Sequence, residues 1–331
     1  MPELRQNLAT KEWVIISTER AKRPEQFKTE KVKKELPSYS ETCPFCPGNE
    51  SKTPDETFVL KKNEQWKVRV VPNKFAALSS SGHLERKIEG LTRWMTGVGI
   101  HEVIIESPLH NVTMGTVSEG NVKDVISVYK NRYLTVSSDP RVKLVTIFRN
   151  NGEAAGTSLE HPHSQLIATP VIPSSIRYRI EEAMRYYDDH GECVYCKMLG
   201  DELTAKERII LETSHFVSFV PYASLSPFHT WFLPKRHTAS FADINDAEIE
   251  DLAKNLKTVL AKFYYGLDNP DYNYVIRSVP IQERECEYYH WYLTIVPRLT
   301  KTAGFELGSG MFINVSVPEE NAKFLREVKL D

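Results

Sequence analysis

The sequence His161-Pro162-His163-Ser164-Gln165 lies at the centre of the segment from Gly156 to Pro170, around which the rest of the chain is organised. Apolar residues on both sides of it are typical of a β-strand, and on a strand the side chains of residues two apart point to the same side. We therefore expect the two imidazoles to share one face. A metal or a backbone group can hold one of them while the other presents a ring nitrogen to a substrate, as nucleophilic catalysis by histidine requires. An isolated His-x-His is more often two ordinary strand histidines, so this interpretation depends on the rest of the chain.

Length and charge limit the classes of protein to which this chain can belong. Its 331 residues exceed the usual size of one domain, which favours two domains or two fused half-domains. The 42 basic and 44 acidic residues give a net charge of -2, which indicates neither a nucleic-acid partner nor an anionic membrane surface. No apolar run is long enough to cross a bilayer, and residues 1–17 lack the apolar core of a signal peptide. We expect a soluble, cytoplasmic protein.

The predicted elements of the first half recur in the same order in the second half. Each half begins with a Cys-x-x-Cys turn, followed by two strands, a helix with apolar residues at helical spacing, and two further strands. In the first half these elements lie at residues 43–46, 66–71, 101–106, 122–139, 142–148 and 156–170. In the second half they lie at residues 193–196, 215–221, 229–233, 249–263, 272–279 and from 290 onward. The repeat predicts an α+β fold in which residues 1–174 and 175–331 form two tandem half-domains, each a mostly antiparallel sheet with a packed helix, joined by a helix at 175–188.

The spacing of the histidines relates the two halves residue by residue. His110 precedes His161 by 51 residues and His237 precedes His290 by 53, so these two pairs correspond. His229 precedes His290 by 61 residues, which makes it the poorer match.

The same comparison separates the two histidines of the opening stretch. His229 corresponds to His101, which begins the equivalent strand of the first half. Two residues beyond the last histidine, His163 of the first half is replaced by Tyr292 in the second. Only the first half has therefore kept a free imidazole at this position.

The cysteines and histidines indicate two metal sites. Zinc favours four Cys and His ligands in tetrahedral geometry, and Cys-x-x-Cys places two thiolates on one turn. The predicted sites are Cys43, Cys46, His110 and His161, and Cys193, Cys196, His237 and His290. Each set leaves no open position, which indicates two structural zinc ions. Accidental spacing of buried cysteines would explain one pair but hardly two pairs related by a repeat, and at the second site His229 stays an alternative to His237.

An ordered set of motifs resembles the galactose-1-phosphate uridylyltransferase family of the histidine-triad superfamily, over nearly the whole chain. The motifs are Glu19-Arg20-Ala21-Lys22-Arg23-Pro24, Cys43-Pro44-Phe45-Cys46, Arg69-Val70-Val71-Pro72-Asn73-Lys74-Phe75-Ala76-Ala77-Leu78, Glu106-Ser107-Pro108-Leu109-His110, His161-Pro162-His163-Ser164-Gln165, Pro221-Tyr222-Ala223, Leu233-Pro234-Lys235 and Gly304-Phe305-Glu306. The resemblance implies histidine-triad-like half-domains and a homodimer whose site is built partly from the neighbouring chain.

The resemblance also implies a ping-pong exchange of a nucleoside monophosphate between a nucleotide sugar and a sugar 1-phosphate. His163 would attack the α-phosphorus and hold the nucleotidyl group, while Gln165 would donate to a phosphoryl oxygen. The matching substrate-binding positions are Arg20 and Arg23 at the diphosphate, Asn73 and Phe75 at the nucleoside, Asn150, Gly156 and Ser158 at the phosphates, and Glu306 at the sugar hydroxyls.

Two departures leave the substrate open. Ser164 stands where the uridylyltransferases carry glycine, as it does in the plant-type ADP-glucose phosphorylases, and Lys74 replaces an aspartate near the ribose. The first hypothesis is a UDP-glucose:hexose-1-phosphate uridylyltransferase. The alternative is an ADP-glucose or dinucleoside polyphosphate phosphorylase, which transfers adenylate to phosphate through the same intermediate. Two further hypotheses are a hydrolase and a non-enzymatic binding module stabilised by zinc. The difference between His163 and Tyr292 argues against the binding module, because a purely structural repeat has no reason to differ at this position.

Overall fold

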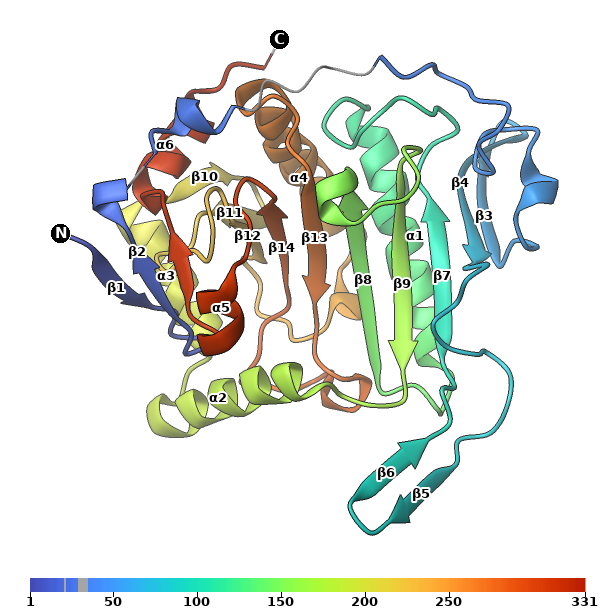
Figure 1. Ribbon diagram of the computed structural model, residues 1–331, viewed down its shortest axis with the longest axis horizontal. Helices are drawn as coiled ribbons and strands as arrows, with labels where there is room; N and C mark the ends of the chain where they lie inside the picture. The colour runs from blue at the N-terminus through green and yellow to red at the C-terminus, as the bar shows by residue number, and fades with distance from the viewer. Residues whose placement is uncertain (21, 29–34, 331) are drawn as a thin grey trace.

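Ten strands from both halves of the chain form one antiparallel sheet in this computed structural model, which describes residues 1–20, 22–28 and 35–330 (Figure 1). The strands of this sheet lie in the order β10-β11-β12-β14-β13-β8-β9-β7-β4-β3. The strands of the described residues are β1 Glu3–Gln6, β2 Trp13–Ile16, β3 Phe58–Lys62, β4 Gln65–Pro72, β5 Arg86–Glu89, β6 Thr92–Met95, β7 Ile100–Ile105, β8 Leu144–Asn151, β9 His163–Thr169, β10 Ile209–Glu212, β11 Phe216–Phe219, β12 Thr230–Pro234, β13 Tyr272–Arg277, β14 Tyr292–Pro297 and β15 Phe312–Asn314. The α-helices are α1 Glu119–Ser137, α2 Ser174–His190, α3 Val194–Ala205, α4 Asp246–Gly266, α5 Gly304–Ser309 and α6 Pro318–Glu327.

The order of the strands is the same when it is read from either edge of the sheet. From one edge the first half contributes β3, β4, β7, β9 and β8, and from the other edge the second half contributes β10, β11, β12, β14 and β13. The two halves meet where β8 pairs with β13, Asn151 opposite Tyr272. The predicted α+β fold of two tandem half-domains is therefore confirmed. The boundary at residue 174 stays a prediction. In a separate sheet, β1 pairs with β2, and β2 pairs with β15 of the C-terminal part.

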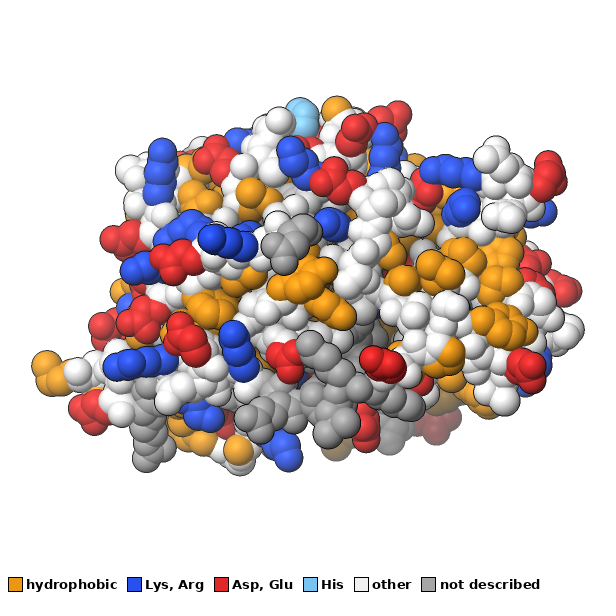
Figure 2. Space-filling view, turned by 90° about the horizontal axis from the view of Figure 1, so that it is seen from above, with side chains coloured by type: hydrophobic (Ala, Val, Ile, Leu, Met, Phe, Trp, Pro, Cys, Tyr) orange, Lys and Arg blue, Asp and Glu red, His pale blue; other side chains and the backbone are white. Residues whose placement is uncertain are grey.

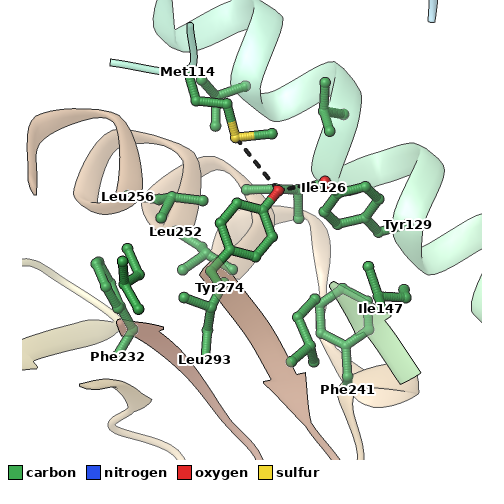
Figure 3. Close-up of a cluster of buried hydrophobic side chains, with 14 of the residues drawn as sticks. Met114, Ile126, Tyr129, Ile147, Phe232, Phe241, Leu252, Leu256, Tyr274 and Leu293 are labelled. Carbon is green, nitrogen blue, oxygen red and sulfur yellow. Dashed lines mark hydrogen bonds between the residues drawn. The ribbon is translucent and has the colours of Figure 1, made fainter. Parts of the chain in front are cut away.

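One face of the sheet is covered by α1 and α4, the two helices predicted from apolar periodicity. Both begin at a side-chain cap: Ser118 accepts from the amide of Asn121, and Asn245 forms a capping box with Glu248. Their apolar stripes meet the sheet and each other in a core that includes Ile126, Leu252, Leu256, Phe232 and Phe241 (Figure 3).

The opposite face is covered unequally. Over the second half, α2 and α3 bury residues such as Ala183 and Tyr195 against Trp231 and Tyr292 of the sheet. Over the first half, β7, β8 and β9 face the viewer in Figure 1, and the described residues place no long helix in front of them. The part of the sheet that begins with His163 is therefore not covered by a long helix among the described residues.

Two predictions of local structure are wrong. His161 does not lie on the strand, because β9 begins only at His163; Pro162 has no amide hydrogen to donate to a sheet ladder. The second Cys-x-x-Cys is not a simple turn, because Cys193 caps α3 and Cys196 lies in its first turn. In the first motif, by contrast, Pro47 and Gly48 follow directly and end any helix, with Gly48 at a φ of 86°.

The surface of the chain agrees with its small net charge. On the face shown in Figure 2, acidic and basic side chains are interspersed and form no large area of one sign among the residues described. None of the described helices combines the length and the apolar character needed to cross a membrane.

Candidate functional site

The first Cys/His cluster brings together Cys43, Cys46, His110 and His161, with all ligand atoms within 4.8 Å of one another. Cys46 Sγ lies 3.5 Å from His110 Nδ1 and 3.6 Å from His161 Nδ1, and the two Nδ1 atoms are 3.3 Å apart. A zinc tetrahedron with bonds of about 2.3 Å to sulfur and about 2.0 Å to nitrogen requires edges of this length. His161 Nε2–H donates to the carbonyl oxygen of Ser107 (2.8 Å), which leaves Nδ1 to face the thiols. These donors fit a zinc ion.

The second cluster repeats this geometry with Cys193, Cys196, His237 and His290. The rings of His237 and His290 lie 5.3 Å apart at 74°, and those of His110 and His161 also lie 5.3 Å apart at 74°. Hydrogen bonding to Cys196, with help from both histidines, lowers the pKa of Cys193 to about 3, whereas the same bond and burial raise the pKa of Cys196, so one of the two sulfurs is favoured as a thiolate. His229 lies outside the cluster and bonds to Thr294 instead (2.7 Å).

His163 lies beside the first cluster, and one of its two ring nitrogens is hydrogen-bonded to the backbone. Its Nδ1–H donates to the carbonyl oxygen of His161 (2.8 Å), and because a carbonyl can only accept, the lone pair of the ring lies on Nε2. Phe45, from the Cys-x-x-Cys turn, packs edge-on against the ring with centroids 5.4 Å apart. Burial lowers the pKa of His163, and the Arg149 guanidinium lowers it further, so the ring is neutral near pH 7. The site thus presents an oriented, neutral imidazole.

A tight turn next to His163 is built on two glycines. Gly152 and Gly156 both have a φ of 88°, which side chains rarely adopt, and they flank the short 3-10 helix η4 at Glu153–Ala155. Asp271 accepts from the amide of Ala154 (2.7 Å) and lies so close to Gly152 that an added Cβ would come within 1.9 Å of its Oδ1. The turn therefore requires glycine at position 152. Its hydrogen bond to Asp271 attaches it to the residue that directly precedes β13.

Asn150 lies at the same end of the sheet as His163. It shares the face of Gln165, because Phe148, two residues earlier on β8, pairs with Gln165. Asn273 of β13 donates to Asn150 Oδ1 (2.7 Å). Because this bond uses the side-chain oxygen of Asn150, the NH2 group of Asn150 is not part of it and stays free to donate elsewhere. Asn150 can then donate to an anion above the sheet.

A buried polar network lies behind β9, on the side away from His163. Tyr129 of α1 donates to Ser164 Oγ (2.7 Å) and lies 3.1 Å from Glu106 Oε1. Glu106 forms an ion pair with Arg149, both with side chains at most 3% exposed. The Tyr129 and Tyr274 hydroxyls face each other (Figure 3). Ser164 thus connects β9 to α1 by a hydrogen bond and lies on the side of the strand opposite to His163.

The second half has closed the equivalent site. Tyr292, which stands at the position of His163, is 2% exposed and stacks on Trp231 with centroids 4.3 Å apart. Tyr195, at the position of Phe45, packs against Tyr292. In the second half, aromatic rings therefore pack around Tyr292, whereas His163, 8% exposed, keeps an imidazole at the matching position.

The structure places the predicted site residues in two groups. His163, Gln165, Asn73 and Asn150 share or border the open sheet face, and the exposed loop residues Gly156, Ser158 and Phe75 adjoin the strands that carry them. Arg23 is exposed just before the 3-10 helix η2, and Glu306 is half-buried on α5, where it caps its own helix by accepting from Ala303 N (2.9 Å). Figure 1 places α5 beside β2 and β15, across the sheet from β9. The side chain of Arg20 lies outside the described part.

Sequence reasoning missed several residues of the site, namely His101, Asn273, Asp271, Glu106 and Arg149. His101 carried one signal, its correspondence to His229 in the repeat. The others became visible only when distant strands were brought together.

Comparisons with known proteins agree over the full chain. Residues 1–173 match the family model of the galactose-1-phosphate uridyl transferase N-terminal domain, and residues 179–307 match that of the C-terminal domain. An ADP-glucose phosphorylase of Arabidopsis thaliana is 37% identical over 334 residues, covering 99% of this chain and 93% of that protein. A galactose-1-phosphate uridylyltransferase of Thermotoga maritima is 30% identical over 341 residues, covering 100% of both. The crystal structure of an Arabidopsis thaliana ADP-glucose phosphorylase with bound ADP-glucose superposes with a TM-score of 0.85 at 35% identity and covers 100% of both chains.

Proposed function

Because this chain belongs to the galactose-1-phosphate uridylyltransferase family of nucleotidyltransferases, we propose that it transfers adenylate from ADP-glucose to orthophosphate through a covalent intermediate on His163. This is the alternative of the sequence analysis rather than its first hypothesis, UDP-glucose with a hexose 1-phosphate. The greater similarity to a plant ADP-glucose phosphorylase than to the uridylyltransferase supports adenylate over uridylate. The observation that carries the chemistry is the fixed ring of His163, whose Nδ1–H is held by the His161 carbonyl so that Nε2 keeps its lone pair.

The proposed reaction has two displacements at the same phosphorus. His163 Nε2 donates its lone pair to the α-phosphorus, the bond from that phosphorus to the bridging oxygen breaks, and glucose 1-phosphate leaves. An oxygen of orthophosphate then attacks, the phosphorus–nitrogen bond breaks, and ADP leaves while Nε2 regains its lone pair. Nδ1–H keeps its bond to the His161 carbonyl through both steps and stabilises the charge that develops on the ring.

The residues around His163 supply the phosphate contacts in this proposal. The Gln165 and Asn150 amides donate to phosphoryl oxygens from the same face, where charge develops during transfer. The Gly156 turn, with Ser158, lets the phosphates approach the backbone closely. Asn73 and the exposed ring of Phe75 are placed to receive the nucleoside beside them.

We assign zinc to both Cys/His clusters, because their donor types and spacings fit it. Bound zinc would act structurally. At the first cluster it would fix His161, whose carbonyl orients His163, and at the second it would fasten α3 to the sheet. Neither set leaves an open position for water.

A homodimer would complete the site. Among the described residues no long helix covers the sheet face above His163, whereas α5, which carries Glu306, lies beside β2 and β15 (Figure 1). The 3-10 helix η2, which follows Arg23, packs against α6. A second copy can bring its Glu306 and its N-terminal arginines to this face, which agrees with the expected site built partly from the neighbouring chain.

Labelling of the intermediate tests the proposal. Enzyme incubated with ADP-glucose or UDP-glucose, each carrying radiolabel at the α-phosphorus, should become labelled in an acid-labile, base-stable form, faster from ADP-glucose. Orthophosphate should discharge the label as ADP. His163→Asn should take up no label, and His83→Asn, at an exposed position of the loop before β5, should behave as wild type.

Other outcomes would correct the proposal in stated ways. Faster labelling from UDP-glucose, with discharge by a hexose 1-phosphate, would restore the uridylyltransferase hypothesis. Label that water removes as fast as any acceptor would indicate a hydrolase. Label that persists in His163→Asn would contradict the mechanism.

A further inference from the structure

We propose that His101 is a positioning residue for nucleotidyl transfer, which holds the Gln165 amide with its oxygen turned inward and its NH2 group turned toward the phosphoryl group. The inference rests on the proposed function, which gives Gln165 a phosphoryl oxygen to contact.

The backbone fixes the tautomer of His101. The amide N–H of Ala77 lies 3.1 Å from His101 Nδ1, and because an amide nitrogen can only donate, Nδ1 is the acceptor of the ring. In the neutral imidazole the hydrogen is then on Nε2. That atom lies 2.8 Å from the side-chain oxygen of Gln165, so His101 Nε2–H donates to it.

Asn73 provides a second hydrogen-bond donor to the same side-chain oxygen of Gln165. The amide N–H of Phe75 donates to Asn73 Oδ1 (2.8 Å), so the other end of the Asn73 side chain is its NH2 group. Asn73 Nδ2 lies 3.4 Å from the Gln165 oxygen and 3.1 Å from His101 Nε2. Both of these nitrogens carry hydrogen, so both converge on the oxygen as donors rather than bonding to each other.

The orientation of the Gln165 amide follows. With two donors on its oxygen, the Gln165 NH2 group must point the other way, on the sheet face that it shares with His163. Without His101, the amide could flip and present an oxygen to a negatively charged phosphoryl group. A single donor that contacts the developing charge is worth about 10²- to 10³-fold in rate.

The second half shows that the fold does not require this arrangement. Its counterparts, His229 and Thr294, also bond to each other (2.7 Å), and the backbone amide of Leu225 lies 3.4 Å from His229 Nδ1, in the place that the amide of Ala77 takes at His101. Thr294, however, has a hydroxyl group and no NH2 group to turn outward. Burial lowers the pKa of His229 to about 3, and the pair is sealed in the core. Only the first half combines a histidine that donates with an amide that has a second, outward donor.

Three substitutions of His101 separate positioning from packing. His101→Gln places an amide NH2 near the position of Nε2 and can still donate to Gln165, whereas His101→Asn can accept from Ala77 but cannot reach Gln165. His101→Phe keeps the shape and removes both bonds. The assay is the single-turnover rate of His163 labelling from ADP-glucose, with KM measured in parallel and His83→Phe as the control at an exposed histidine.

We expect labelling by the Asn and Phe variants to fall by about tenfold to a hundredfold with a much smaller change in KM, because a misdirected donor acts on the transition state. His101→Gln should keep most of the rate. In a Gln165→Ala background, His101→Phe should cause little further loss, since the residue acts through Gln165.

The outcomes distinguish the two proposals. If wild type takes up no label, the proposed function fails and this inference fails with it. If wild type is labelled and His101→Phe is labelled at the same rate, only the role of His101 is overturned. The same holds if His101→Phe lowers the labelling rate by the same factor in the Gln165→Ala background as it does in the wild-type background. Should His101→Phe melt below the assay temperature, the Asn and Gln variants decide, and equal rates in these two would overturn the inference.

Discussion

Ser164 and His163 are neighbours in sequence, but they lie on opposite faces of β9. His163 faces the open side, whereas Ser164 is fully buried and accepts from Tyr129 of α1. Ser164, which the family resemblance predicts to be a departure from the uridylyltransferases, therefore makes no contact on the side of the strand that carries His163.

Replacing Ser164 tests this separation of faces. Ser164→Ala should cost about 1 kcal/mol of unfolding free energy, because Tyr129 loses a buried partner. The ratio of kcat/KM for ADP-glucose to that for UDP-glucose should stay the same. Steady-state kinetics with both nucleotides provide the measurement, and a reversal of the preference would show that Ser164 selects the base after all.

The buried ion pair between Glu106 and Arg149 gives a second prediction for single residues. Glu106→Gln should destabilise the fold by about 3–5 kcal/mol, because it leaves the Arg149 charge buried without its partner. Urea unfolding provides the measurement. Glu250→Gln, which removes an exposed partner of Lys123, is the control and should change the midpoint little. Equal effects of the two substitutions would contradict this account.

The turn between β8 and β9 is the element that shapes the phosphate side of the site. Gly152→Ala should reduce the labelling rate of His163 strongly, since its Cβ would collide with Asp271 and displace the turn. Gly191→Ala is the matched control, because Gly191 also has a positive φ, 69°, but nothing lies within 4 Å of an added Cβ. The control should lose about 1 kcal/mol of stability and keep its activity. Comparable kinetics in the two variants would show that the turn does not shape the site.

The two Cys-x-x-Cys segments support different parts of the fold: the first lies in the cluster that holds His161, and the second lies at the start of α3. Loss of a metal from each cluster should therefore have different consequences. Cys43→Ser and Cys193→Ser should each lower the zinc content by about one equivalent. Only Cys43→Ser should also slow the labelling of His163, because His161 of the first cluster orients His163. Metal analysis beside the labelling assay tests this. Unchanged zinc in either variant would refute the assigned ligands.

At the scale of the whole molecule, the open face of the first half and the remote position of Glu306 predict a shared site. His163→Asn and Glu306→Ala should each be inactive alone, and co-expressed chains should recover about a quarter of wild-type activity, because half of the dimers are mixed and each mixed dimer has one intact site. Activity of purified mixed dimers is the measurement. No recovery in a verified mixed dimer would place Glu306 in the site of its own chain or outside any site.

The sequence by itself determined the repeat, the α+β class, the two principal helices and the sets of cysteines and histidines that come together. These features follow from local periodicity, from the short reach of a Cys-x-x-Cys segment and from a comparison of the two halves. It also distinguished His163 from its counterpart Tyr292, because a change of residue type at one repeat position is visible without coordinates.

Only the tertiary structure decided which groups surround His163 and in which orientation. Asp271 lies far from Gly152 in sequence, and Glu106 far from Arg149, so no local pattern could pair them; strand pairing across the sheet did. The orientation of Gln165 depends on backbone amides at 75 and 77, whose direction is set by a loop that the sequence does not specify in detail. Hydrogen-bond direction depends on three-dimensional geometry, and this is why the sequence could single out His163 but not the residues that orient the side chains around it.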